Sequence, residues 1–358
     1  MKGRQILVEP RADGGAAAAL VVDGRLEDLL VDPAPRPGAL SDGAAPGPEA
    51  IFRAVAGRPM KGAGGVMMEL GGGAMGFLRG ARMPGAGKRV LVQVSTWAEP
   101  GKAPPVSTRL RLKGRFAILT PGAPGTNLSR NIADGPERDA LAAVAAAAMA
   151  GAAADLGLIV RSLAAGADPA ALAAEIAALR AELAAIEDAA ATGPAGLLRA
   201  APGAAVLAAR DWPDHAGAPV EVHPEALARA GIWEEAAALL RPDVALPGGG
   251  SLAIEATRAL VAVDVNTGGE TGAGAALAVN VAAARELPRQ LRLRGLGGQV
   301  AIDFAPLAKP ERARVEAALK AALRRDGIET SLAGWTPLGH LELLRKRARR
   351  PLAEAPLR

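Results

Sequence analysis

Two short apolar runs near the C-terminus each end in an aspartate, and a helical segment joins them. The first run, 260–263, leads into Asp264, Val265 and Asn266, and the second, 299–302, leads into Asp303. A helix between two strands places them parallel in one sheet. Their carboxyl ends then share the edge at which open α/β sheets hold ligands. We therefore expect an α/β layer with polar side chains gathered at this edge.

The segments that follow extend this layer. The residue pattern predicts a helix over 309–325, a strand over 330–335 and a second helix over 338–349, with Pro288 inside the preceding helix 273–294. Alternating strands and helices are typical of a parallel sheet. We therefore expect a parallel α/β sheet in the last hundred residues or so.

The polar side chains at the strand ends suit a cation with oxygen ligands. Asp264 and Asn266 are two residues apart in a strand and share one face, and Asp303 on the neighbouring strand can converge with them. Two carboxylates and an amide oxygen suit Mg²⁺, with Mn²⁺ as the alternative ion. Such an ion activates water or neutralises a phosphate. The aspartates could instead be helix caps or ion-pair partners, and Asn266 could be part of a turn.

The composition excludes several other classes of site. The chain has no cysteine, which excludes disulfides and thiolate metal sites, and its 3 histidines are scattered, so we expect no zinc. No apolar run reaches the roughly 18 residues that a membrane span requires, and no apolar segment follows the charged N-terminus. We therefore expect a cytoplasmic protein without a membrane span.

The first two thirds of the chain predict strands, then a barrel, then helices. Strands are expected at 5–8 and 16–22, and a Pro- and Gly-rich stretch at 32–48 marks a boundary. Short strands with regular turns suggest a small barrel, and they are expected at 51–55, 65–70, 75–78, 89–94 and 107–112. Beyond it we expect strands at 116–119 and 156–161, a helix at 136–149, and a helix capped by Asp168. That last helix carries one apolar stripe, which is formed by Leu172, Ile176, Leu179, Leu183 and Ile186.

Four blocks of residues resemble the catalytic segment of the ribonuclease E/G family. They are 246–251 (LPGGGS), 263–266 (VDVN), 289–298 (RQLRLRGLGG) and 302–304 (IDF). The resemblance implies a DNase I-like catalytic subdomain. In that subdomain Asp264 and Asp303 would hold magnesium, and Asn266 would support it.

A second resemblance lies upstream, at 157–162 (GLIVRS), which is similar to the family's 5′-sensor motif. It implies that Arg161 and Ser162 grip the 5′-monophosphate of RNA, with Gly114 and Ile118 beside them. Serine stands where relatives carry threonine, and it keeps the hydroxyl donor. Arg161 could instead be a surface or interface arginine, because a guanidinium serves many anions.

The barrel lies where the family carries an OB-type RNA-binding domain. Phe77 is the candidate for stacking on a base, an interaction worth roughly 1–3 kcal/mol. Met67 stands where a second aromatic residue is expected, which predicts a weaker grip on RNA. Phe77 could instead belong to the barrel core.

The resemblance implies an α/β multidomain fold. A structural RNase H-like subdomain (1–35 and 196–245) would carry an inserted OB-type barrel (36–113) and a 5′-sensor region (114–195). The DNase I-like catalytic subdomain would follow at 246–358. Since cysteine is absent and the sequence stops at Arg358, we expect neither the family's zinc link nor its small C-terminal domain. A zinc-linked dimer is not expected, and the oligomeric state stays open.

The resemblance implies a magnesium-dependent endoribonuclease that acts on single-stranded RNA in processing or decay. It would leave a 5′-phosphate and a 3′-hydroxyl and favour 5′-monophosphorylated RNA. The net charge of +5 fits a polyanionic partner, and we expect Arg289, Arg292 and Arg294 to steer the RNA backbone from an exposed helix face. That face could instead be only solvated. The alternatives for the whole chain are an RNA-binding protein with little or no cleavage, or a DNA nuclease.

Overall fold

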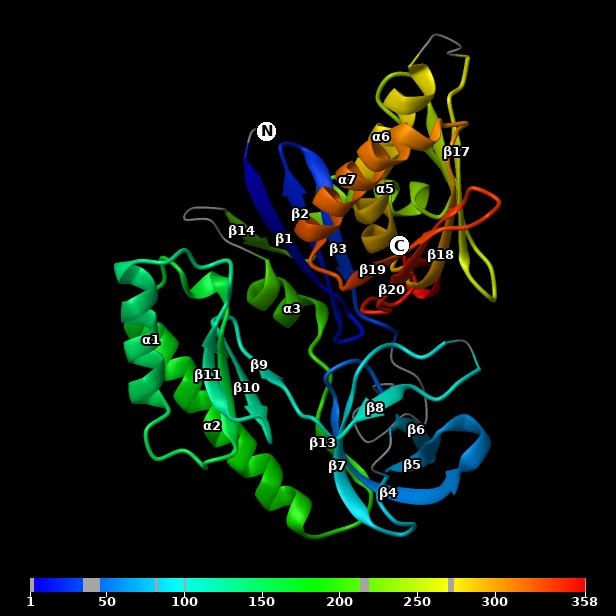
Figure 1. Cartoon of the computed structure of the whole chain (residues 1–358). Helices are drawn as coiled ribbons and strands as arrows, with labels where there is room; N and C mark the ends of the chain where they lie inside the picture. Colours follow the sequence, from blue (N-terminus) through cyan, green and yellow to red (C-terminus); the bar gives the residue numbers. More distant parts are fainter. Residues whose placement is uncertain are drawn as a thin grey trace. The chain divides into compact units, whose positions relative to one another are not determined.

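A computed structural model of the chain describes residues 3–34, 46–80, 83–99, 101–212, 219–269 and 274–357. The chain divides into two compact units, Met1–Ala34 with Ala218–Arg358, and Pro35–Gly217 (Figure 1). None of the described helices is long and apolar enough to cross a membrane.

The first unit begins with a small sheet of four strands in the order β14-β1-β2-β3. Its strands are β1 (Arg4–Pro10), β2 (Ala16–Val22), β3 (Arg25–Val31) and β14 (Val220–Val222). The strands predicted at 5–8 and 16–22 are thereby confirmed. Helices α4 (Ala226–Arg229) and α5 (Ile232–Ala238) share a core with this sheet. The fully buried Glu9 of β1 ties them to it, since its carboxylate accepts hydrogen bonds from the Trp233 indole at 3.1 Å and the Leu227 amide at 2.9 Å.

The second sheet of this unit has six strands in the order β15-β16-β17-β18-β20-β19. They are β15 (Asp243–Ala245), β16 (Ser251–Ala256), β17 (Val261–Asn266), β18 (Gly298–Asp303), β19 (Thr330–Trp335) and β20 (Leu341–Arg345). Helices α6 (Ala275–Leu293) and α7 (Lys309–Asp326) pack on each other and share one apolar core with the strands. The helices and strands expected between 252 and 335 are present.

The prediction of a helix over 338–349 is wrong, because β20 occupies that segment. Leu341 and Leu343 are buried while Glu342 and Leu344 are exposed, which is the period of two that a strand requires. Strand β20 runs antiparallel to both β18 and β19. The sheet is therefore mixed rather than parallel as we expected, and among its described strands only β17 and β18 pair in parallel.

The second unit contains a closed barrel of five strands. They are β4 (Ile51–Met60), β5 (Gly65–Gly71), β6 (Ala74–Arg79), β7 (Arg89–Val94) and β8 (Pro105–Ser107). Pairing of β4 with β7 closes the barrel, which is consistent with an OB-type fold. The expected fifth strand at 107–112 differs from the structure, since β8 ends at Ser107. The short β9 (Leu112–Lys113) joins another sheet.

The rest of the second unit is a four-stranded sheet with two long helices. Its strand order is β11-β12-β10-β9, with β10 (Ala117–Pro121), β11 (Gly125–Leu128) and β12 (Leu156–Val160). Helices α1 (Pro136–Ala148) and α2 (Pro169–Ala191) pack on it, and α3 (Ala204–Asp211) follows later. Asp168 caps α2 as predicted, accepting from the Ala170 amide at 2.9 Å. The whole apolar stripe of α2 is buried, which confirms its prediction.

The subdomain boundaries expected from the sequence differ from these units in detail. Strand β13 (Gly196–Arg199), assigned to the RNase H-like part, pairs instead with barrel strand β4. Strand β15, assigned to the same part, pairs with β16 of the second sheet. Most of the boundary predicted at 32–48 lies outside the described residues. Short 3-10 helices complete the elements, at Lys61–Ala63, Ser162–Ala164 and Leu352–Glu354.

Candidate functional site

Asp264 and Asp303 lie side by side at the ends of the two parallel strands. They are direct partners in the register of β17 and β18. Both strands alternate at this end, with Val263 and Ile302 buried and the two aspartates exposed. The apolar positions fix the strands in the core, so the register forces both carboxylates onto the same face. The convergence that we expected for these two residues is present.

Asn266 and His340 flank this pair of carboxylates. The Asn266 side-chain amide donates to Asp264 Oδ2 at 2.7 Å, which leaves the Asn266 carbonyl oxygen as a further acceptor. The His340 Nε2 atom lies 3.8 Å from Asp303 Oδ2, and the side chains of these two residues are 40% and 64% exposed. The four side chains therefore form an open, acidic cluster on the sheet.

The chemistry of this cluster fits a divalent cation with many water ligands. Two adjacent carboxylates repel each other, and among the described residues neither forms an ion pair with a lysine or arginine. Magnesium binds through one or two carboxylates and retains several waters, so it does not require a dense protein cage. Within the described ranges, no group of three or more His, Cys, Asp and Glu residues that could hold a metal ion is present.

His340 was missed by our reading of the sequence. The prediction placed it in a helix, whereas the structure places it in the turn before β20, where its carbonyl accepts from the Thr336 amide at 2.8 Å. Because Ile302 pairs with Leu341 across antiparallel strands, the residue before Leu341 must lie next to Asp303. The alternation from Leu341 to Arg345 is the signal that could have revealed it.

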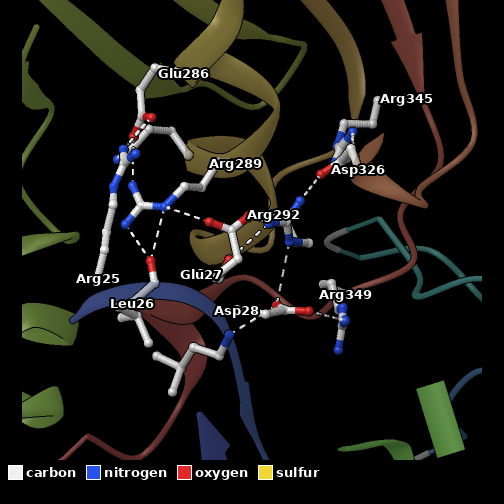
Figure 2. Close-up of polar contacts among 12 residues, drawn as sticks. Arg25, Leu26, Glu27, Asp28, Glu286, Arg289, Arg292, Asp326, Arg345 and Arg349 are labelled. Carbon is white, nitrogen blue, oxygen red and sulfur yellow. Dashed lines mark hydrogen bonds and ion pairs between the residues drawn. The ribbon is translucent and has the colours of Figure 1, made fainter. Parts of the chain in front are cut away.

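Two of the three arginines expected on an exposed face of α6, Arg289 and Arg292, are instead directed inward (Figure 2). Arg292 and Arg294 are buried, and the Arg289 side chain is only 13% exposed. Arg289 donates to the Leu26 carbonyl at 2.9 Å and to Glu286 at 2.6 Å. Arg294 donates to the Arg241 carbonyl at 2.6 Å. These three arginines therefore form neither the exposed face that we expected to steer RNA nor a face that is only solvated.

Arg292 is the centre of a buried ion-pair network between β3, α6 and α7. It donates to Glu27 at 2.6 Å and also to Asp326, whose carboxylate forms an ion pair with Arg345 at 2.6 Å (Figure 2). Burial alone would lower the pKa of Arg292, but the charges of Asp28, Asp326 and Glu27 outweigh it and raise that pKa. The network joins the small sheet to the helices behind the acidic cluster, which gives these arginines a structural role.

The residues of the expected 5′-phosphate pocket lie together in the second unit. The Arg161 guanidinium donates to the Gly114 carbonyl at 2.6 Å, and the Arg161 amide donates to the Phe116 carbonyl at 2.7 Å. Ile118 pairs with Ile159 between β10 and β12, and Ser162 opens the 3-10 helix after β12. The structure therefore brings these residues to one end of the sheet.

Glu175 of α2 holds the loop that carries Gly114. Its carboxylate accepts from the backbone amides of Arg115, Phe116 and Ala117 at 2.8, 2.7 and 2.9 Å. A Cβ atom on Gly114 would lie 2.4 Å from this carboxyl group, so the close approach requires glycine.

We expect Glu175→Gln to destabilise the protein by about 1–3 kcal/mol, because an NH₂ group replaces an oxygen that faces backbone donors. Urea unfolding measures this loss, with Glu187→Gln as the control, since Glu187 is an exposed residue of the same helix. Equal stability of the two variants would contradict the role given to Glu175.

Phe77 lies on β6 of the barrel and is half-buried. Its direct partner across β5 is Met67, the residue that stands where a second aromatic was expected. The Arg79 guanidinium carbon is 5.9 Å from the centre of the Phe77 ring. A partly exposed aromatic ring with a cation beside it suits contact with a base and a phosphate.

The model of the Ribonuclease E/G family matches residues 111–223 and 214–348. Ribonuclease E of Nostoc sp. is 31% identical over an alignment of 298 residues that covers 73% of this chain and 43% of that protein. Ribonuclease E of Escherichia coli strain K12 is 30% identical over an alignment of 308 residues that covers 75% of this chain and 29% of that protein. Ribonuclease G of Salmonella typhimurium is 41% identical over 115 residues, 31% of this chain and 24% of that protein. The chain thus spans less than half the length of these relatives.

Proposed function

This chain belongs to the ribonuclease E/G family, and from that premise we propose that it is an endoribonuclease whose catalytic centre is the acidic cluster around Asp264 and Asp303. The substrate class is single-stranded RNA, and the reaction is hydrolysis of internal phosphodiesters. The observation that carries the proposal is the direct pairing of Asp264 with Asp303 on parallel strands. Neither carboxylate pairs with a lysine or an arginine of the described residues, and two such adjacent carboxylates suit a site for Mg²⁺.

Asp264 and Asp303 would hold the Mg²⁺ ion, with Mn²⁺ as the alternative. When bound, the ion supplies charge neutralisation at a phosphate and lowers the pKa of a bound water. Asn266 orients Asp264 through its amide, and its carbonyl oxygen would supply a further acceptor for the ion or its waters. His340 stands at the opposite side of Asp303, with its Nε2 atom 3.8 Å from Asp303 Oδ2. Hydrolysis at this centre would leave a 5′-phosphate and a 3′-hydroxyl.

The second unit would hold the RNA strand. The guanidinium of Arg161 and the hydroxyl of Ser162 would bind the 5′-monophosphate, beside Gly114 and Ile118. Phe77 would stack on a base from the barrel. We propose no RNA contact for Arg289, Arg292 and Arg294, whose burial supports a structural role. RNA processing or decay in the cytoplasm is the setting that we propose for this activity.

A cleavage assay tests the proposal. Single-stranded RNA and DNA of the same sequence, labelled at the 3′ end, are incubated with the protein with and without Mg²⁺. We expect internal cuts in RNA alone, which need Mg²⁺ and yield new 5′-phosphate ends. Bound but uncut RNA at every Mg²⁺ concentration would contradict the enzyme and favour an RNA-binding protein, and cutting of the DNA would favour a DNA nuclease.

A further inference from the structure

Arg161 does not stand alone in its pocket, because a chain of alternating charges reaches it from the barrel. Its Nη2 atom lies 2.8 Å from Oδ1 of Asp211, the last residue of α3. Arg210 donates to the same carboxylate from Nη2 at 2.8 Å and from Nε at 3.1 Å. Asp211 is therefore shared between two arginines.

The chain continues from Arg210 to the base of the barrel. The Arg210 guanidinium donates to both oxygens of Glu49, at 2.6 and 2.9 Å, and Lys113 donates to Glu49 at 2.9 Å. The Arg210 and Glu49 side chains are 8% and 13% exposed. Glu49 also has a φ of 74°, a left-handed conformation that non-glycine residues seldom adopt. A buried pair next to a strained backbone forms a fixed anchor for Arg210.

The charges of these five linked side chains leave Arg161 able to bind an anion. Lys113, Arg210 and Arg161 are positive and Glu49 and Asp211 are negative, so one positive charge is uncompensated. Burial raises the pKa of Asp211, but the hydrogen bonds and charges of Arg210 and Arg161 outweigh it and hold that pKa below its ordinary value. Burial also raises the pKa of Glu49, but the hydrogen bonds and charges of Arg210 and Lys113 outweigh it and lower that pKa. Both carboxylates therefore stay charged at neutral pH.

Arg161 uses some of its N–H donors to fix its own orientation and keeps others for a ligand. One nitrogen is used by the Gly114 carbonyl and another by Asp211, which together fix the plane of the guanidinium. A guanidinium has five N–H donors, so three remain for a ligand. Arg210 already compensates the charge of Asp211, so Asp211 can orient Arg161 without cancelling its attraction for a phosphate.

We propose that Asp211 is the positioning residue for Arg161, and that it sets the preference of this protein for RNA with a 5′-monophosphate. Arg210, anchored on Glu49, holds Asp211 in place. This inference rests on the proposed binding of the 5′-phosphate by Arg161. It adds Asp211 to that binding, a residue some fifty positions from Arg161 in the sequence. Asp211 couples the barrel to the pocket.

A binding measurement tests the proposal without cleavage. Fluorescence anisotropy in EDTA gives the affinity of one labelled single-stranded RNA with a 5′-monophosphate and of the same RNA with a 5′-hydroxyl. The quantity compared is the ratio of the two affinities. If removal of Asp211 only removes a negative charge, both RNAs bind more strongly. If it also removes the orientation of Arg161, the ratio of the two affinities falls.

We expect Asp211→Asn to reduce this ratio roughly tenfold, as the loss of one oriented charge-assisted contact would. Asp188→Asn is the matched control, because Asp188 is an exposed residue of α2 in the same unit and undergoes the same change of charge. In an Arg161→Gln background, Asp211→Asn should have no further effect, since it acts only through Arg161. Thermal unfolding checks that each variant folds. If Asp211→Asn does not fold, Asp211→Glu replaces it in the comparison.

The outcomes are distinct. A ratio that is unchanged or raised in Asp211→Asn, while the wild type prefers the 5′-monophosphate, overturns the positioning role and leaves the proposed function intact. An equal effect of Asp211→Asn with and without Arg161 also overturns it. A wild-type ratio of one contradicts 5′-phosphate binding itself, and the positioning role with it.

Discussion

Asp303→Asn is expected to lower kcat for RNA cleavage by roughly a thousandfold, a loss that only Asp264→Asn should match among the changes that we predict. The amide has the shape of the carboxylate but lacks its charge, and Asp303 supplies one of the two carboxylates that the described residues bring to the site. Because Asp303 is exposed at a strand end, its side chain contributes little to the core. RNA affinity and the unfolding midpoint should therefore stay close to those of the wild type.

Steady-state cleavage of a 5′-monophosphorylated RNA at saturating Mg²⁺ measures this effect. Glu234→Gln is the control, because Glu234 is an exposed residue of α5 in the same unit and the change removes one negative charge. Asp264→Asn should resemble Asp303→Asn. Wild-type kcat in both aspartate variants would exclude the acidic cluster as the catalytic centre.

Asp326→Asn is expected to cost about 3–5 kcal/mol of the free energy of unfolding, the largest stability effect that we predict. The Asp326 side chain is only 1% exposed and compensates both Arg292 and Arg345 (Figure 2). Arg345 is fully buried, and its Nε and Nη2 atoms have no hydrogen-bond partner among the described residues. Removal of this carboxylate leaves Arg345 without an ion-pair partner among the described residues, and leaves Arg292 with only Glu27 and Asp28.

Urea unfolding of the whole chain measures this loss. The control is Glu225→Gln, which breaks a pair with Arg229 whose side chains are 60% and 57% exposed. Exposed pairs contribute about 0–1 kcal/mol, so this variant should unfold close to the wild type. A loss below 1 kcal/mol in Asp326→Asn would mean that water or a rearranged network compensates the arginines.

The sequence predicts those parts of the fold that local pattern determines. The apolar stripe of α2 and its Asp168 cap are short-range features, and both are present. The same holds for the two strands that end in Asp264 and Asp303, since their alternation fixes which residues face the core. Strand β20 was mistaken for a helix because Leu341–Arg345 gives only two buried leucines, a pattern too short to separate the two periods.

Contacts between side chains far apart in the sequence could not be predicted from it. Arg292 looks like a surface cation within a basic helix, and its partners Glu27 and Asp28 lie more than two hundred and sixty residues earlier. Asp211 likewise reaches Arg161 only through a side-chain contact between the last residue of α3 and the residue after β12. His340 depends on the antiparallel register of β20, which was itself not predicted. Each of these contacts follows from the tertiary arrangement rather than from a local motif.

If Asp264 and Asp303 form one site for a divalent cation, isothermal titration calorimetry should detect metal binding that depends on both residues. Mg²⁺, and separately Mn²⁺, would be titrated into the wild type, Asp264→Asn and Asp303→Asn in the absence of RNA. We predict one ion per chain in the wild type and loss of that binding in either variant. Equal stoichiometry and affinity in all three proteins would contradict this shared site, since the ion would then be held elsewhere.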